Sequence, residues 1–477
     1  MTHLPPHAKS RHTKIVCTLG PATSAPEKIR ELILSGMDVV RLNFSHGGRD
    51  EHRQTIRLIR RLAQETGKEV GILQDLAGPK IRLGTLPAER ELKAGERVAF
   101  APGQPAGPAL IPVEYPHLLE DVSVGNRILL ADGLVEVEVE SVERDRLVCR
   151  VLAGGVISSR KGLNLPLSKL RIPAFTDKDR LDLLAGLEES VDFVAMSFVR
   201  HEEDLEPAAR MISSRERGPL LIAKIEKPEA VERLPQILER VDGLMVARGD
   251  LGVEVPLEDV PIIQKNLIRA ARRSGKPVIT ATQMLRSMVS SPRPTRAEAN
   301  DVANAILDGT DAVMLSEESA VGDYPAEAVC VLDRVARVAE PYLREADLLN
   351  EPESRVIQET EADVSRAAAQ LAFDLKAVAI VAFTMSGRTA RYVARFRPSR
   401  PVVALTPSLE THRQLALSSG VIPIRVEPFT DTDRVFELAS SSVLEKGLAR
   451  RGDRLVITAG VPLGVPSATN MLRVLEI

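Results

Sequence analysis

Two segments near the middle of the chain share one design: Leu220-Leu221-Ile222-Ala223-Lys224-Ile225-Glu226-Lys227 and Gly243-Leu244-Met245-Val246-Ala247-Arg248-Gly249-Asp250-Leu251-Gly252. In each, an apolar stretch typical of a buried strand leads directly into charged residues. We expect a buried strand to end in Lys-x-Glu or Arg-Gly-Asp only where its carboxyl end faces a polar site. The two segments therefore predict buried strands whose ends carry the chemistry of the protein.

Outward from these segments, strand-like and helix-like stretches alternate along most of the chain. Amphipathic charged stretches such as 228–241 and 257–274 separate short apolar segments rich in β-branched residues. Segments that are apolar on both faces are typical of buried parallel strands. These strands are predicted at 14–19, 38–44, 70–75, 192–198, 220–225, 243–246, 277–281 and 311–315. The pattern favours an α/β fold with a (β/α)8 TIM barrel, and a doubly wound open sheet is the alternative.

The alternation is interrupted once and resumes in a different form near the end. With 477 residues, the chain is long enough for two to four domains of about 100–200 residues each. An inserted all-β lid domain is expected over the active face, with strands at 91–100, 127–130, 134–142 and 147–151. A C-terminal α/β domain is predicted from a helix at 365–375 and strands at 377–382 and 471–477. The expected boundaries are 1–77 and 174–350 for the barrel, 78–173 for the lid and 351–477 for the C-terminal domain.

Composition and charge exclude several classes of function. The 63 Lys and Arg nearly balance 66 Asp and Glu, so the net charge of −3 provides no overall attraction to nucleic acid or an anionic membrane. Cys17, Cys149 and Cys330 form no CxxC pair, so we expect no zinc site or disulfide but reduced thiols in a cytoplasmic protein. Residues 1–13 are polar and no run of about 18 apolar residues occurs, so neither a signal peptide nor a transmembrane helix is expected.

The strand-end charges suit a divalent metal and an anionic substrate. In a barrel the carboxyl ends of the strands form the active face, where Lys224, Glu226 and Asp250 would meet. Two carboxylates from separate strands suit Mg²⁺ (or Mn²⁺), which takes its remaining ligands from water and substrate. The lysine would stabilise charge on a transferring phosphoryl group. The alternative is a structural ion pair at the barrel rim.

Polar side chains follow four other predicted strands. Arg41-Leu42-Asn43-Phe44-Ser45-His46 ends the second, and Asp75-Leu76-Ala77-Gly78-Pro79-Lys80-Ile81-Arg82 ends the third and starts the insertion. The first of these segments offers anion and cation ligands, and Lys80 and Arg82 in the second would face the cleft. Hydroxyls end the seventh and eighth strands, where they would relay a proton or cap a helix: Thr282 and Ser316.

Together these segments resemble the pyruvate kinase family over nearly the whole chain. The matching segments, in family order and with the insertion in the same place, are 14–21, 36–46, 78–84, 161–166, 223–227, 245–254, 281–285, 293–309 and 314–325. The resemblance implies transfer of the phosphoryl group of phosphoenolpyruvate to ADP, giving pyruvate and ATP in glycolysis. It also implies a homotetramer under allosteric control.

The resemblance assigns roles to individual residues. Glu226 and Asp250 would hold Mg²⁺, and Lys224 would stabilise the phosphoryl group in transfer. The amides near Gly249 and Asp250 would receive the carboxylate of the substrate. Thr282 and Ser316 would support the proton delivery that turns the enolate into pyruvate. Contacts to phosphate and nucleotide would come from Arg41, Asn43, His46 and Arg82, and from Lys161 and Asp132 of the closing lid.

One departure from the family concerns a monovalent cation. Most members use K⁺ as well as Mg²⁺, and Asn43, Ser45 and Asp75 match that cation site. The usual Thr-Lys-Gly-Pro-Glu run here reads Leu76-Ala77-Gly78-Pro79-Lys80, so Leu76 lacks the hydroxyl ligand. The Lys80 ammonium carries the same charge as K⁺, and members with lysine here are the K⁺-independent group. We predict activity without K⁺; the alternative is that Lys80 points to solvent. Glu317 also departs, standing where the family has Gly or Ala.

In the family the C-terminal domain carries an allosteric phosphate site. Its phosphate-binding loop is matched by Thr384, Ser386, Gly387, Arg388 and Thr389. Hydroxyls, a glycine and amides before a helix suit an anion, although such a run is also an ordinary helix start. The last loop, 459–470, holds no Lys or Arg to capture a second phosphate. We therefore expect a monophosphate effector, a sugar phosphate or AMP.

Two other classes of function compete with an active kinase. One is a different Mg²⁺-enolate barrel, such as an aldolase or lyase acting on pyruvate-like acids. The inserted β domain and the position of Lys224 argue against it. The other is a catalytically inactive metabolite sensor, which the intact set of Arg41, Lys224, Glu226, Asp250 and Thr282 argues against.

Overall fold

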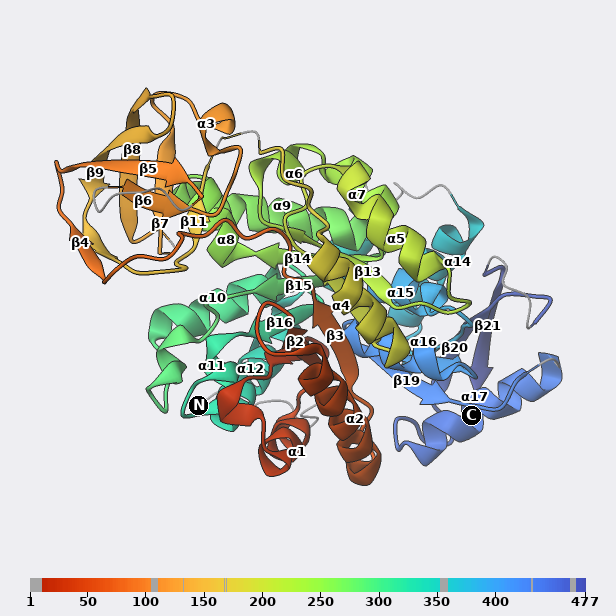
Figure 1. The fold of residues 1–477 in the computed structure, drawn as a ribbon. Coiled ribbons are helices and arrows are strands. Elements are labelled where there is room, and N and C mark those ends of the chain that lie inside the picture. The colour runs from red at the N-terminus through yellow and green to blue at the C-terminus, as the bar shows by residue number, and fades with distance from the viewer. Residues whose placement is uncertain are drawn as a thin grey trace.

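Eight parallel strands form a closed barrel at the centre of the molecule (Figure 1). The computed structural model describes residues 11–103, 110–131, 133–166, 168, 170–351, 359–429, 432–463 and 469–477. The strands close in the order β1-β16-β15-β14-β13-β12-β3-β2. They are β1 (Lys14–Thr18), β2 (Val39–Asn43), β3 (Gly71–Asp75), β12 (Phe193–Met196), β13 (Leu220–Ile225), β14 (Gly243–Ala247), β15 (Val278–Ala281) and β16 (Ala312–Leu315). The predicted TIM barrel is confirmed, and the open sheet is excluded.

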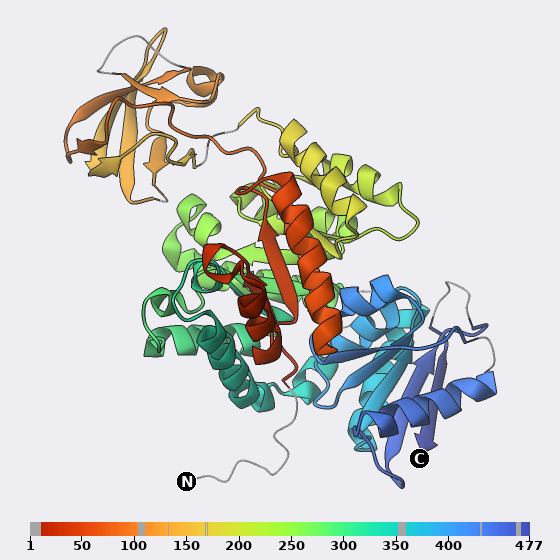
Figure 2. The same cartoon turned by 60° about the horizontal axis from the view of Figure 1, so that its bottom comes forward.

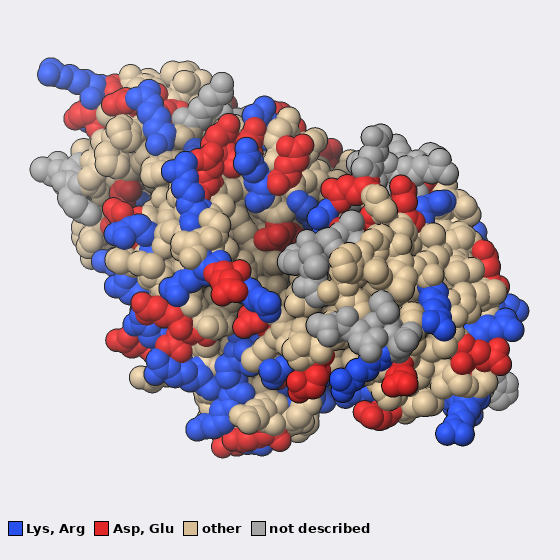
Figure 3. Space-filling model, turned by 90° about the vertical axis from the view of Figure 1, so that its right-hand side faces the viewer, with Lys and Arg blue, Asp and Glu red and all other residues tan. Residues whose placement is uncertain are grey.

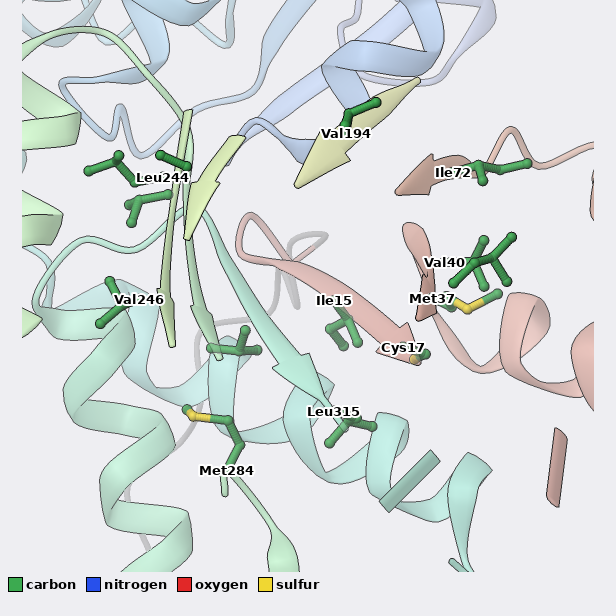
Figure 4. Close-up of a cluster of buried hydrophobic side chains, with 14 of the residues drawn as sticks. Ile15, Cys17, Met37, Val40, Ile72, Val194, Leu244, Val246, Met284 and Leu315 are labelled. Carbon is green, nitrogen blue, oxygen red and sulfur yellow. The ribbon is translucent and has the colours of Figure 1, made fainter. Parts of the chain in front are cut away.

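Alternate residues of the barrel strands pack into two hydrophobic layers, one inside the barrel and one between the barrel and its helices. Val16, Leu73 and Met245 belong to the cluster that fills the barrel interior. Neighbours such as Ile15 and Leu244 belong to the cluster beneath the surrounding helices (Figure 4). Burial on both faces explains why the strand sequences are apolar throughout. The helices of the outer layer include α1 (Pro26–Ser35), α2 (Arg49–Thr66), α4 (Asp177–Glu188), α5 (Glu206–Ser213), α9 (Val260–Arg273), α10 (Arg296–Leu307) and α12 (Pro325–Ala339).

One predicted helix is divided. The stretch 228–241 forms α6 (Pro228–Glu232) and α7 (Leu234–Arg240), with Arg233 at the junction. Pro235 is the second residue of α7. Because proline lacks an amide hydrogen, it is tolerated in the first turn of a helix but not in the middle of one. The proline therefore separates the two helices.

The inserted segment forms a separate β domain that stands away from the barrel (Figure 2). Its larger sheet has the order β11-β7-β8-β9-β5-β6, and β10 pairs with β4. The strands are β4 (Arg90–Leu92), β5 (Arg97–Pro102), β6 (Leu110–Val113), β7 (Arg127–Leu130), β8 (Val135–Val142), β9 (Leu147–Ala153), β10 (Gly155–Ile157) and β11 (Leu163–Asn164). The single strand predicted at 91–100 is wrong. The amide of Glu96 donates to the carbonyl of Lys93, and this turn divides the segment between two sheets.

The C-terminal domain is built on a five-stranded sheet of order β19-β18-β17-β20-β21, with β21 antiparallel to β20. Its strands are β17 (Ala379–Phe383), β18 (Val402–Thr406), β19 (Val421–Arg425), β20 (Arg454–Ala459) and β21 (Met471–Glu476). Its helices include α14 (Thr360–Asp374), α15 (Arg388–Ala394), α16 (Leu409–Gln414) and α17 (Thr432–Glu445).

This domain covers the amino end of the barrel, opposite the lid (Figure 1). Ala416 and Leu417 belong to the cluster that fills the barrel interior. Arg397 forms a buried ion pair of 2.8 Å with Asp311, the residue just before β16. The lid and the C-terminal domain thus lie at opposite ends of the barrel.

The surface matches the balanced composition. Acidic and basic side chains are intermingled on the face shown in Figure 3. Within the described ranges, none of the helices combines the length and apolar character needed to cross a membrane.

Candidate active site

The side chain of Lys224 lies at the centre of a charged cluster at the carboxyl end of the barrel. Its Nζ is 2.7 Å from Oε1 of Glu226 and 3.4 Å from Oδ1 of Asp75. It also donates a 2.7 Å hydrogen bond to Oγ of Ser197. Burial alone would lower the pKa of Lys224, but the carboxylates of Asp75, Glu226 and Asp250 outweigh burial and raise it. The lysine is therefore a fixed positive charge at neutral pH.

Arg41 and Asp75 extend this cluster across the neighbouring strands. Nη2 and Nε of Arg41 lie 2.6 and 2.7 Å from Oδ2 of Asp75, and Nη1 donates to Oγ1 of Thr18 at 3.0 Å. Burial would raise the pKa of Asp75, but Lys224 and Arg41 lower it. The carboxylate of Asp75 thus forms ion pairs with two candidate catalytic residues, Arg41 and Lys224.

Asp250 follows the adjacent strand, β14, by three residues and is the expected second metal ligand. It lies in the first turn of α8 (Arg248–Glu254). The residue is exposed to solvent, although the surrounding protein partly desolvates its carboxylate. Burial and the nearby Glu226 carboxylate raise the pKa of Asp250 to about 6, against the opposing effect of Lys224 and Lys80. A divalent cation would relieve this repulsion, so the two carboxylates fit such an ion.

A site with only two protein carboxylates, Glu226 and Asp250, also suits a divalent cation such as Mg²⁺. No group of three or more His, Cys, Asp or Glu with metal-binding geometry occurs in the described part of the chain. Mg²⁺ commonly uses one or two carboxylates and completes its shell with water and substrate oxygens. A site built from Glu226 and Asp250 alone is therefore sufficient if the substrate supplies oxygens.

Gly249 and Thr282 join the ends of β14 and β15. The amide of Gly249 donates to Oγ1 of Thr282 at 2.8 Å, and an added Cβ at Gly249 would lie 3.3 Å from that oxygen. Thr282 itself has φ of +64°, an unusual conformation for a β-branched residue. Arg248 holds it there by donating to its carbonyl at 2.6 Å while pairing with Asp301 at 2.7 Å. Sequence reasoning missed the Arg248–Asp301 pair, because 53 residues separate the two partners.

Ser316 follows β16 with a buried hydroxyl that has no hydrogen-bond partner among the described residues. Its amide donates to Glu318 at 2.8 Å, and the same carboxylate accepts from the amide of Leu285 at 3.0 Å. Sequence reasoning missed this role of Glu318. The unusual Glu317 is directed outward, pairing with Arg286 at 3.5 Å with 57% of its side chain exposed. Glu317 is therefore not part of the cluster.

Basic side chains border the cluster toward the lid. Burial lowers the pKa of His46, and Lys80, Arg82 and Arg41 lower it further. Lys80 is exposed and makes no hydrogen bond or ion pair within the described residues. Its pKa is lowered, because partial desolvation and the charges of Lys224 and Arg82 outweigh the opposite effect of Asp250 and Asp75. Lys80 therefore lies within the electric field of the cluster without contacting it.

The other residues matched to the cation site are already engaged. Oδ1 of Asn43 accepts from the amide of Ser45 at 3.1 Å. Asp75 is paired with Arg41 and Lys224. Leu76 is 1% exposed and presents an apolar side chain.

The lid residues expected at the nucleotide are only partly placed. Arg82 donates to the carbonyl of Arg160 at 2.8 Å. The carbonyl of Lys161 accepts from Leu83 at 2.9 Å, and its side chain is exposed. No hydrogen bond or ion pair between that side chain and the barrel occurs in the described ranges. Asp132 lies outside the described residues.

The expected effector loop lies between β17 and α15. Oγ1 of Thr384 accepts from the amide of Gly387 at 2.9 Å, and the hydroxyls of Thr389 and Thr469 are 2.6 Å apart. Ser386 is exposed. Arg388 pairs with Glu361 at 2.9 Å and with Glu359. The hydroxyls of Thr384 and Thr389 thus lie at the expected loop, whereas Arg388 is paired with Glu359 and Glu361.

Comparison with known proteins agrees with this geometry. The family model described as pyruvate kinase, barrel domain, matches residues 10–329, and pyruvate kinase, alpha/beta domain, matches 362–475. Pyruvate kinase 2 of Synechocystis sp. is 47% identical over 481 residues, covering 97% of this chain and 79% of the relative. Pyruvate kinase of Geobacillus stearothermophilus is 46% identical over 470 residues, covering 97% and 80%. The crystal structure of a pyruvate kinase from Cryptosporidium parvum has a TM-score of 0.93 at 36% identity, covering 98% of this chain and 96% of that chain. These matches exclude the aldolase or lyase alternative, and the chain belongs to the pyruvate kinase family.

Proposed function

We propose that the charged cluster transfers the phosphoryl group of phosphoenolpyruvate to ADP. The bond from phosphorus to the enol oxygen breaks, a bond to the terminal phosphate oxygen of ADP forms, and the enolate takes a proton at carbon to give pyruvate. The supporting observation is the position of Lys224, a fixed ammonium 2.7 Å from Glu226 with Asp250 on the adjacent strand end. Phosphoryl transfer depends mainly on such positioning and charge neutralisation.

In this proposal Glu226 and Asp250 hold Mg²⁺, and Mn²⁺ would suit the same oxygens. When bound, the ion neutralises charge on the phosphoryl and carboxylate oxygens of the substrate. Lys224 stabilises the phosphoryl group as it moves. The amides near Gly249 and Asp250 receive the substrate carboxylate.

Proton delivery to the enolate is assigned to Thr282 and Ser316. Oγ1 of Thr282 accepts from Gly249 and donates to the carbonyl of Ala281 at 2.7 Å, which fixes the hydroxyl. The Ser316 hydroxyl has no such partner in the described chain, so it is available to bind water or substrate. The nucleotide phosphates are assigned to Arg41, Asn43 and His46 of the barrel, and to Arg82, Lys161 and Asp132 of the lid.

We further propose that Lys80 removes the need for K⁺. The sequence supports this, because Leu76 offers no ligand oxygen and Lys80, four residues later, carries an ammonium with the same charge as K⁺. The loop from Thr384 to Thr389 is proposed to bind a monophosphate effector, a sugar phosphate or AMP. The active form is proposed to be a cytoplasmic homotetramer, which sedimentation at assay concentrations tests.

The reaction is tested by coupling pyruvate formation to lactate dehydrogenase with phosphoenolpyruvate, ADP and Mg²⁺. We expect NADH oxidation that requires all three components. Removal of the divalent ion with EDTA should stop it, and added Mg²⁺ or Mn²⁺ should restore it. Absence of turnover in the wild-type protein would exclude the proposal and favour the inactive sensor.

A further inference from the structure

Phe198 connects the barrel, the lid and the carboxylate of Glu226. It lies just beyond β12 with φ of +62°, a conformation that a bulky residue adopts only where its surroundings impose it. In this conformation its amide donates to Oε2 of Glu226 at 3.0 Å. Its ring packs against the hydrophobic cores of both the barrel and the lid. One residue therefore orients the carboxylate with its backbone and contacts the lid with its side chain.

Two cations lie over the Phe198 ring and extend its contacts. Cζ of Arg200 is 5.5 Å from the ring centroid, and this guanidinium donates to the carbonyls of Leu170 and Ile172 at 2.7 and 3.0 Å. Those two carbonyls belong to the segment that returns from the lid to the barrel. Nζ of Lys227 lies 4.5 Å from the same centroid. The ring is therefore fixed to the lid connection on one side.

Lys227 provides a second connection, through Glu254. Nζ of Lys227 is 2.6 Å from Oε1 of Glu254, and the two side chains are 8% and 3% exposed. The same oxygen accepts from Nδ2 of Asn164 in lid strand β11 at 3.3 Å. Glu254 is the last residue of α8, whose first turn carries Asp250. A lid side chain is thus joined to the helix that presents the second metal carboxylate.

We propose that Phe198 and Glu254 are positioning residues that couple docking of the lid to the placement of Glu226 and Asp250. Each carboxylate has its own connection: Glu226 through the Phe198 amide, and Asp250 through α8 and Glu254. Partners that orient metal ligands commonly change metal affinity although they never touch the metal. Loss of the contacts between the lid and the barrel should therefore lower the affinity of Glu226 and Asp250 for a divalent cation. This inference rests on the proposed role of Glu226 and Asp250 as metal ligands.

The decisive variant is Asn164→Ala, which removes the hydrogen bond from the lid to Glu254 and no hydrogen bond that the described residues make within the charged cluster. Binding of Mn²⁺ alone is measured by electron paramagnetic resonance, without substrate or turnover. We expect the dissociation constant to rise about fivefold or more. The matched control is Asn126→Ala, because the side-chain oxygen of Asn126 accepts a hydrogen bond from the amide of Ser123 at 2.8 Å within the lid. The control should bind Mn²⁺ as the wild-type protein does.

Glu254→Gln tests the same connection from the barrel side. It keeps the size of the side chain but removes the charge that holds Lys227, and we expect a similar loss of Mn²⁺ affinity. Its control is Glu202→Gln, which removes the charge from an ion pair of 2.7 Å with Arg233 away from the cluster. Thermal unfolding of each variant separates a loss of metal affinity from a loss of folded protein.

The outcomes distinguish the coupling from the metal assignment. Glu226→Gln should abolish Mn²⁺ binding. If it does, and Asn164→Ala and Glu254→Gln still bind within about twofold of the wild-type protein, the coupling is overturned and the proposed function stands. If Glu226→Gln binds Mn²⁺ normally, the metal assignment fails and the coupling is overturned with it.

Discussion

The ammonium nitrogen of Lys224 lies 2.7 Å from Oε1 of Glu226, two residues further along the chain. Residues two apart on a strand share one face, so Lys-x-Glu at a barrel strand end directs both side chains to the same site. The lysine charge is thereby fixed next to a carboxylate expected to bind metal.

Lys224→Met should reduce kcat by about 10²–10³-fold with little change in the KM for phosphoenolpyruvate. The reason is that the ammonium acts on charge that develops during transfer. Lys224→Arg, which keeps the charge, should lose less than Lys224→Met. The coupled assay measures both, and a rise in KM at unchanged kcat would assign the lysine to substrate binding instead.

Potassium should activate the enzyme less than about twofold when it replaces tetramethylammonium in a buffer with saturating Mg²⁺. Lys80→Glu removes the resident ammonium and should make activity depend on K⁺. Activation of the wild-type protein by about tenfold or more would show that Lys80 does not replace the ion.

Divalent metal affinity should fall as the pH drops below about 6. The pKa of Asp250 is raised to about 6 by burial and by Glu226, so a proton competes with the metal for this carboxylate below that pH. Affinity should therefore be lost on acidification and constant above about pH 7. Mn²⁺ titrations across this range measure it, and Asp250→Asn should bind weakly at every pH. An unchanged wild-type affinity at pH 5 would contradict the assignment.

Arg397→Met should destabilise the protein by about 3–5 kcal/mol, because it leaves the buried carboxylate of Asp311 without its cation. Chemical denaturation measures the change in the free energy of unfolding. The control is Arg413→Met, whose ion pair of 3.2 Å with Glu69 is partly exposed. That variant should lose at most about 1 kcal/mol. Equal effects would show that burial does not distinguish the two pairs.

Gly387→Ala should abolish the effector response and leave kcat without effector unchanged. Gly387 has φ of +79°, and an added Cβ would lie 2.8 Å from Nη1 of Arg391. Gly447→Ala is matched, since that glycine has φ of +66° but nothing within 4 Å. Sugar monophosphates, AMP and fructose 1,6-bisphosphate are titrated at subsaturating phosphoenolpyruvate. Activation by the bisphosphate alone would contradict a monophosphate site.

The barrel and the positions of its charged strand ends were predictable because parallel strands buried on both faces leave a continuous apolar signal. Their carboxyl ends meet at one rim, so residues as distant in sequence as Asp75 and Lys224 were expected together. The contacts of Phe198 were not predictable. Phenylalanine favours extended backbone, and its left-handed conformation arises from tertiary contacts. Likewise, the pairing of Arg248 with Asp301 depends on how α10 packs, which hydrophobic patterning does not specify.

The position of Ala416 and Leu417 limits how domains can be combined between members of this family. The family models match the barrel and the C-terminal domain as separate stretches of sequence, yet these two side chains complete the packing inside the barrel. The C-terminal domain therefore supplies the side chains that close the amino end of the barrel interior. A chimera that joins this barrel to a relative's C-terminal domain places that relative's residues against the interior of this barrel. The residues at positions 416 and 417 and the barrel residues that they contact must therefore be exchanged together.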